Sequence, residues 1–221
     1  NLPFFMFPEV YHQGLYKNIA DLRYSERNVQ FFLRGSILDD YENPEMKELF
    51  GLLNRFEITM RVGEHYREIN GFLEIETMEE TKKVLEGLKL DFLLLRNSAV
   101  DLTYWLTLLS KCNFFIAPPG FMMPFSHNLY EAMAVGCIPI TQYGKFFDPP
   151  LIDGETCISF SSTAGLIQTI NKLLYMDIEE ISRLRSNVTR YYDTHLDARK
   201  VVAKIEANKE RLTQLYIIAG H

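Results

Sequence analysis

Between Pro118 and Ile140 the chain reads PPGFMMPFSHNLYEAMAVGCIPI, which is a loop broken by glycine and proline, a short helical stretch and an apolar run. The apolar run that begins at Cys137 has the composition of a buried strand. A loop and helix that lead into a buried strand are typical of α/β proteins with a parallel sheet. The stretch therefore predicts the fold class, and it raises the question of whether the loop and helix bind a ligand.

The same alternation continues along the chain from Asn28. Apolar runs of strand length are separated by segments whose apolar residues recur with a period near 3.6, as in helices. The pattern predicts a doubly wound parallel sheet of about six strands with helices on both faces. The predicted strands are residues 29–33, 58–62, 92–95, 114–117, 137–141 and 156–160.

We expect three parts in the chain. Residues 1–27 are predicted to be a connector or extension, because Pro3 and Pro8 interrupt their apolar cluster and exclude an ordinary central strand. Residues 28–197 are predicted to form the α/β domain, and residues 198–221 a C-terminal amphipathic helix. Because the chain starts at Asn1 rather than Met, we expect a processed or excised segment.

Composition excludes some classes of protein. The chain has 221 residues, 47% of them hydrophobic, which is enough for one sizeable core. A formal net charge of −6 argues against a nucleic-acid-binding surface, because contacts to many phosphates need clustered Lys and Arg. No run approaches the roughly 20 apolar residues of a membrane span, and the first residues lack a secretory signal. The cysteines are predicted to be reduced core residues: Cys112, Cys137 and Cys157.

Candidate binding residues follow from the sheet, because ligands of open parallel sheets bind beyond the carboxyl ends of the strands. The loop before the predicted helix is the longest segment at that edge, and a helix start offers unpaired N–H groups that favour a phosphate. Cations in neighbouring loops can donate to phosphate oxygens, and a glycine lets the backbone approach a ligand closely. The residues with these properties are Arg34, Gly120, Ser126, His127, Asn128 and Lys145.

Each feature has a second interpretation that the sequence leaves open. The Gly/Pro loop can simply turn the chain between two strands. Glu131 can complete a capping box with Asn128, since the two residues are three positions apart. His127 and Arg34 can pair with nearby carboxylates, and Lys145 can be a solvated turn residue.

The run from Pro124 to Ile140 resembles the pattern E-P-F-G-x-x-x-x-E-A-M-A-x-G-x-P-V of the C-terminal, donor-binding domain of group 1 GT-B-fold glycosyltransferases. It also resembles the E-A-x-x-x-G-C-I-P-V of exostosin-type enzymes. Residues 96–98, 113–119, 142–144 and 151–160 resemble further motifs in the same order, so the resemblance spans about residues 28–195. It implies a Rossmann-like domain that binds a nucleotide-diphosphate sugar, and transfer of the sugar to a glycan or glycoconjugate acceptor in polysaccharide or glycoconjugate synthesis.

The resemblance also implies roles for single residues. Glu131 stands where the family hydrogen-bonds the ribose of the donor nucleotide, and residues 120–128 would face the diphosphate and sugar. Arg34, with Lys145 as a second cation, would neutralise the diphosphate. Residues 96–98, including Arg96 and Asn97, would lie near the base. Neither a metal nor another cofactor is expected, because side chains and the helix dipole supply the positive charge.

The sequence departs from the family in two ways. Met123 stands where retaining members carry a first Glu, so the stereochemistry is open, with inversion favoured. GT-B enzymes also use two Rossmann-like domains, so we expect a second one in cis or in trans. The general base is unassigned, and the candidates are Glu64, His65 and His127 or a residue outside this segment.

Two other functions and a location belong to these expectations. One alternative is a non-catalytic nucleotide- or glycan-binding module of a larger assembly, and the other is an unrelated doubly wound phosphate-binding protein. We expect a cytoplasmic protein, either free or at the cytoplasmic face of the membrane.

Overall fold

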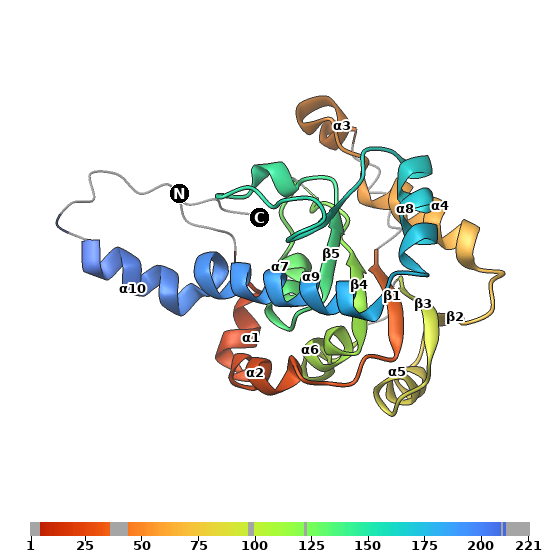
Figure 1. The fold of residues 1–221 in the computed structure, drawn as a ribbon, viewed down its shortest axis with the longest axis horizontal. Helices are drawn as coiled ribbons and strands as arrows, with labels where there is room; N and C mark the ends of the chain where they lie inside the picture. The colour runs from red at the N-terminus through yellow and green to blue at the C-terminus, as the bar shows by residue number, and fades with distance from the viewer. Residues whose placement is uncertain (1–4, 36–43, 97–99, 122, 209, 211–221) are drawn as a thin grey trace.

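The computed structural model describes residues 5–35, 44–96, 100–121, 123–208 and 210 (Figure 1). These residues form one parallel sheet of six strands in the order β2-β3-β1-β4-β5-β6. Helices cover both of its faces, so the predicted fold class is confirmed. The strands are β1 (Val29–Arg34), β2 (Phe72–Ile75), β3 (Leu90–Leu95), β4 (Cys112–Ile116), β5 (Ile138–Thr141) and β6 (Ile158–Ser159).

The helices form two layers. On one face α5 (Met78–Leu85), α6 (Leu102–Ser110) and α7 (His127–Ala134) pack in a row, and on the other α4 (Arg55–Tyr66) packs against α8 (Thr163–Leu173). Right-handed crossovers place the helix after β1 and the helix after β4 on opposite faces. The carboxyl ends of the neighbouring strands β1 and β4 therefore form the switch point of the sheet, where ligands of such folds bind.

Shorter elements and the C-terminal helices surround these layers. The long helix α9 and the helix α10 run nearly end to end across the molecule, and α3 projects from the body (Figure 1). The remaining elements are α1 (Pro8–His12), η1 (Leu15–Asn18), α2 (Ile19–Leu22), α3 (Glu45–Phe50), η3 (Gly144–Phe146), α9 (Ile178–Tyr191), the π-helical turn η4 (Tyr192–Leu196) and α10 (Ala198–Asn208).

The predicted strand at residues 58–62 is wrong, because this segment lies inside α4. Asn54 begins the helix, and its side-chain oxygen accepts a hydrogen bond from the Glu57 N–H at 2.8 Å. Ile58, Val62 and Tyr66 recur every four residues and form the buried stripe of the helix. The true second strand is β2, an edge strand whose side chains are mostly half-buried and which therefore lacks a continuous apolar run.

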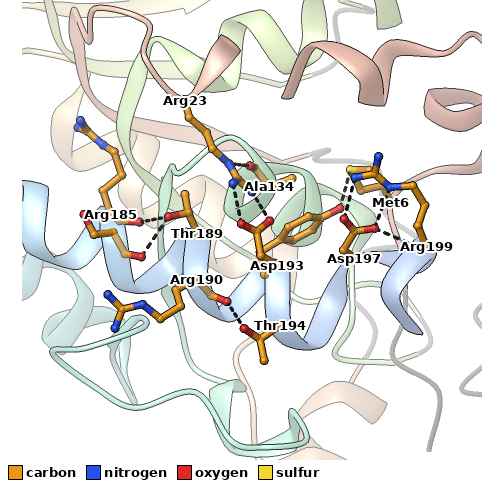
Figure 2. A network of polar contacts seen from close by, with 12 residues as sticks. Met6, Arg23, Ala134, Arg185, Thr189, Arg190, Asp193, Thr194, Asp197 and Arg199 are labelled. Carbon is orange, nitrogen blue, oxygen red and sulfur yellow. Dashed lines mark hydrogen bonds and ion pairs between the residues drawn. The ribbon is translucent and has the colours of Figure 1, made fainter. Parts of the chain in front are cut away.

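The N-terminal segment, residues 5–27, is attached to α7 and to the C-terminal helices. The Arg23 guanidinium donates to the carbonyl of Ala134 at 2.8 Å and forms a two-pronged pair with Asp193 at 2.8 and 2.9 Å (Figure 2). Met6 is 2% exposed, and its sulfur accepts a hydrogen bond from the Tyr192 hydroxyl. These contacts hold the N-terminal segment against α7, the helix that begins at the switch point, and against η4.

The three cysteines are free and buried, as the sequence predicts. Among the described residues, no helix combines the length and the apolar character that a membrane crossing requires.

Candidate functional site

A pocket of about 210 Å³ lies at the switch point between β1 and β4. It is smaller than the roughly 300–1,000 Å³ of pockets that enclose a drug-sized ligand, so it has room for a part of a nucleotide. The side chains that line it come from the N-terminal segment, β1, the segment before α6, α6 itself and α7. They are Phe7, Arg34, Val100, Leu102, Trp105, His127, Asn128 and Glu131.

Helix α7 presents its first turn to this pocket. Ser126 is the N-cap, with extended backbone angles, and the helix begins at His127. The capping-box interpretation of Glu131 is therefore wrong, because this residue is the fifth of the helix rather than the third. Glu131 points instead into the protein, where 1% of it is exposed.

Two donors from distant parts of the chain satisfy the Glu131 carboxylate. Its Oε1 atom accepts a hydrogen bond from the backbone N–H of Phe7 at 2.9 Å, and Oε2 accepts one from Nε1–H of Trp105 at 2.6 Å. Burial raises the pKa of this carboxyl above its ordinary value of 4.5, while the two hydrogen bonds and the charges of His127 and Arg34 oppose the rise. The site thus holds a desolvated acceptor next to positive groups.

The raised pKa of Glu131 makes the stability depend on pH. Because the folded protein binds this proton more readily than the unfolded chain, the favourable contribution is complete below about pH 4.5 and is lost as the pH rises through the folded pKa. As the pH rises through the folded pKa of Glu131, we expect the free energy of unfolding of the unmodified protein to fall relative to that of Glu131→Gln. Urea unfolding of both proteins at a series of pH values measures the difference, and two parallel curves would contradict the expectation.

Trp105 connects the two charged groups of the pocket. The guanidinium carbon of Arg34 lies 4.5 Å from the centroid of the Trp105 ring, within the range of a cation–π interaction. None of the sequence motifs points to this role for Trp105. The available signal is that Trp105 is the only tryptophan of the chain, and a buried indole N–H normally needs an acceptor.

His127 contacts the N-terminal segment. Its Nδ1 atom lies 2.6 Å from the carbonyl oxygen of Phe5, and since a carbonyl only accepts, Nδ1 carries the proton and donates. The ring of Phe7 meets the imidazole edge-on at 5.6 Å. Residues 5–7 therefore cover both His127 and Glu131, a contact that no local sequence pattern predicts.

Two predicted cations lie away from this pocket. Arg96 pairs with Glu74 of the edge strand β2 at 3.0 Å. Lys145 is exposed, and its ammonium lies 5.0 Å from the ring centroid of Phe146. Asn97 lies outside the described residues. The position of a residue in a loop at the carboxyl edge does not determine the direction of its side chain, and these two cations point elsewhere.

Gly120 is required by the loop itself. A β-carbon at this position would lie 2.5 Å from the carbonyl oxygen of Phe125 and 2.7 Å from that of Met123. Both contacts are to backbone atoms, which cannot move aside as a flexible side chain does. The glycine therefore allows the loop to fold closely on itself, and this accounts for Gly120 without a ligand.

The candidate bases Glu64 and His65 lie in the last turn of α4, not in a loop after a strand. Helix α4 starts at the carboxyl edge, where the Arg55 side chain donates to the Pro119 carbonyl at 3.1 Å. Its last residue, Tyr66, stacks on Phe92 of β3 with ring centroids 5.1 Å apart, on the face of the sheet opposite to α6 and α7 (Figure 1). The two candidates therefore lie away from the pocket.

In the described part of the chain, no three His, Cys, Asp or Glu side chains gather in a group that could hold a metal ion.

No protein-family model matches the sequence, and the comparison with curated proteins gives no match. Among solved structures, HepE of Anabaena in complex with UDP-glucose is similar at 15% identity over 89% of this chain and 53% of its own, with a TM-score of 0.50. HepE in complex with UDP gives 16% identity, 90% and 55% coverage and the same TM-score. The chain thus spans about half the length of these structures. The likeness shows the fold alone, a Rossmann-like α/β sheet, as the sequence predicts.

Proposed function

We propose that this chain is the donor-binding half of a metal-independent glycosyltransferase that transfers a sugar from a nucleotide-diphosphate sugar to a glycan or glycoconjugate acceptor. The observation that carries the proposal is the buried Glu131 carboxylate beside Arg34, in the pocket at the switch point of the sheet. The complexes of HepE with UDP and UDP-glucose, which share this fold, support it.

In this proposal Glu131 accepts hydrogen bonds from the two ribose hydroxyls. An ionised carboxylate has about four acceptor sites, and the N–H groups of Phe7 and Trp105 use one on each oxygen. One site on Oε2 is left for a diol, and Oε1 becomes free for it when Phe7 withdraws its N–H. Because only 1% of Glu131 is exposed, the nucleotide reaches the carboxylate when Phe7 moves aside.

Arg34 and the start of α7 receive the diphosphate. Helix N-termini bind phosphate through unpaired N–H groups, and here Ser126, His127 and Asn128 form that start beside the pocket. A nucleoside diphosphate gains negative charge as it leaves the sugar, so these donors also stabilise the transition state. This arrangement supplies positive charge from side chains and backbone, and no metal enters the proposal.

The remainder of the reaction belongs to a second domain. The pocket is too small for a whole nucleotide sugar, and the chain spans about half the length of HepE. We propose that a second Rossmann-like domain, in cis or in trans, supplies the acceptor side and the general base. The thioether of Met123 cannot serve as a sugar-contacting carboxylate, and this favours inversion.

Removal of Arg34 tests the diphosphate part of the site. Arg34→Met is expected to weaken UDP binding about tenfold or more, because a charge-assisted hydrogen bond contributes about 1.5–3 kcal/mol, and to weaken uridine binding much less. Calorimetric titration of the folded variant measures both. The exposed Arg61 gives the matched control Arg61→Met, which is expected to bind UDP as the unmodified chain does. An equal loss for uridine and UDP would contradict the assignment.

Catalysis is tested separately from binding. The second candidate function, a non-catalytic nucleotide- or glycan-binding module, is favoured by Met123 at the position of the family's first Glu. Incubation of the chain with UDP-, GDP- and TDP-sugars distinguishes the two candidates. Hydrolysis of the donor or transfer to an acceptor glycan rejects the module, whereas saturable binding without turnover, in the presence of the second domain, rejects the enzyme.

A further inference from the structure

We infer that Trp105 is a positioning residue that holds the Arg34 guanidinium and the Glu131 carboxylate in the arrangement that a nucleotide requires. The inference rests on the proposed function and deepens it, because it assigns the orientation of both charged groups to one side chain. Nothing in the sequence motif points to Trp105, which lies 26 residues before Glu131 on a different helix.

The two contacts use different parts of the indole. Its edge donates Nε1–H to Oε2 of Glu131 at 2.6 Å, and its face lies under the guanidinium carbon of Arg34 at 4.5 Å. An indole N–H can only donate a hydrogen bond, so it binds the carboxylate, and the face of the ring remains for the guanidinium. One rigid side chain therefore links a cation on β1 with an anion on α7.

Trp105 is itself held firmly. It is 2% exposed, and its ring packs against Phe32 of β1 with centroids 5.6 Å apart. The start of its helix α6 is fixed by Asp101, whose carboxylate accepts a hydrogen bond from the Thr103 N–H at 2.9 Å. A side chain fixed in this way can orient its two partners before a ligand binds, which lowers the entropy cost of binding.

Loss of the indole N–H raises the pKa of Glu131 further, in addition to releasing its position. The groups that face this carboxylate are Arg34 on β1, His127 on α7, Tyr11 on α1 and the N–H of Phe7. Burial already raises the pKa of Glu131, and the Trp105 hydrogen bond opposes the rise. Without it the carboxyl takes up a proton at a higher pH, and a protonated carboxyl accepts fewer hydrogen bonds from a diol.

The test is the pH dependence of UDP-glucose binding by Trp105→Phe, which keeps an aromatic ring and removes the N–H. Relative to the unmodified chain, we expect weaker binding by the variant at low pH and recovery as the pH is raised, because its Glu131 carboxyl ionises at a higher pH. A purely structural role predicts an equal loss at every pH, and this result would overturn the inference. Tyr104→Phe, a change at an exposed neighbour on the same helix, is the control.

A second measurement needs no variant. Trp105 is the only tryptophan, so its indole N–H gives one assignable NMR signal. We expect this signal to shift both with the ionisation of Glu131 and on addition of UDP-glucose. A signal that does not move while calorimetry shows UDP-glucose binding would reject the role of Trp105. An unmodified chain that binds no UDP-glucose would reject the proposed function itself, so the two failures are distinguishable.

Discussion

Glu131→Gln is expected to weaken the binding of UDP and UDP-glucose about 10- to 100-fold. Each hydrogen bond to an ionised group contributes about 1.5–3 kcal/mol, and about 1.4 kcal/mol corresponds to a factor of ten in affinity. The amide keeps one acceptor oxygen and replaces the other by an NH₂ donor. That donor then faces the N–H of Phe7 or of Trp105, so the acceptor pair for the ribose is lost.

The control must separate lost binding from lost folding. Glu86→Gln changes the net charge by the same amount at an exposed position after α5, and it is expected to bind UDP as the unmodified chain does. Near-ultraviolet circular dichroism establishes that the Glu131→Gln sample is folded before each titration. If the folded variant binds UDP within about twofold of the unmodified chain, Glu131 is not the ribose contact.

Gly35→Ala is expected to lower the free energy of unfolding by about 1–3 kcal/mol or more. Gly35 follows β1, and a β-carbon at this position would lie 1.8 Å from Oγ1 of the fully buried Thr59 on α4. No side-chain rotation removes this overlap completely, because Cβ of Thr59 would also lie at 2.9 Å. Strand and helix must therefore separate at the carboxyl edge, next to Arg34.

Thr59→Ala provides the matched test of this contact. Within the described residues the Thr59 hydroxyl is buried without a hydrogen-bond partner, so the main expected cost of Thr59→Ala is the lost burial of one methyl group, about 1 kcal/mol. In the Gly35→Ala background the same change should restore part of the lost stability. Guanidinium chloride unfolding of the two single variants and the double variant measures the coupling energy. Strictly additive effects would show that the overlap is not the cause.

The fold was predictable because its central strands are buried on both faces. Val29–Arg34 and Cys112–Ile116 are almost uninterrupted apolar runs, which is how interior parallel strands read in a sequence. The prediction of a strand at residues 58–62 is wrong because this segment has an ambiguous apolar pattern. A short run with apolar residues four positions apart fits a strand and a helix equally, and Asn54 decides in favour of the helix. The edge strand β2 is half-exposed, so its apolar pattern is weaker than that of the central strands or of α4.

Only those parts of the candidate site that follow from the order of strands and helices along the chain could be predicted from the sequence. Arg34 ends strand β1 and Glu131 lies on the helix after the longest loop, so topology alone brings them to the same edge. Trp105 and Phe7 reach Glu131 across 26 and 124 residues of sequence. Such contacts arise from the packing of α6 and of the N-terminal segment on α7, and no local spacing encodes them.

Binding of a nucleotide sugar in the switch-point pocket can be measured by hydrogen exchange of the backbone amides of residues 120–131 and of Phe7, with and without UDP-glucose. We expect slower exchange at the start of α7, where the diphosphate would bind, and faster exchange at Phe7, whose N–H leaves Glu131 when the ribose enters. Unchanged exchange in this stretch with every one of UDP-, GDP- and TDP-sugars would contradict the claim that the switch-point pocket binds a nucleotide sugar.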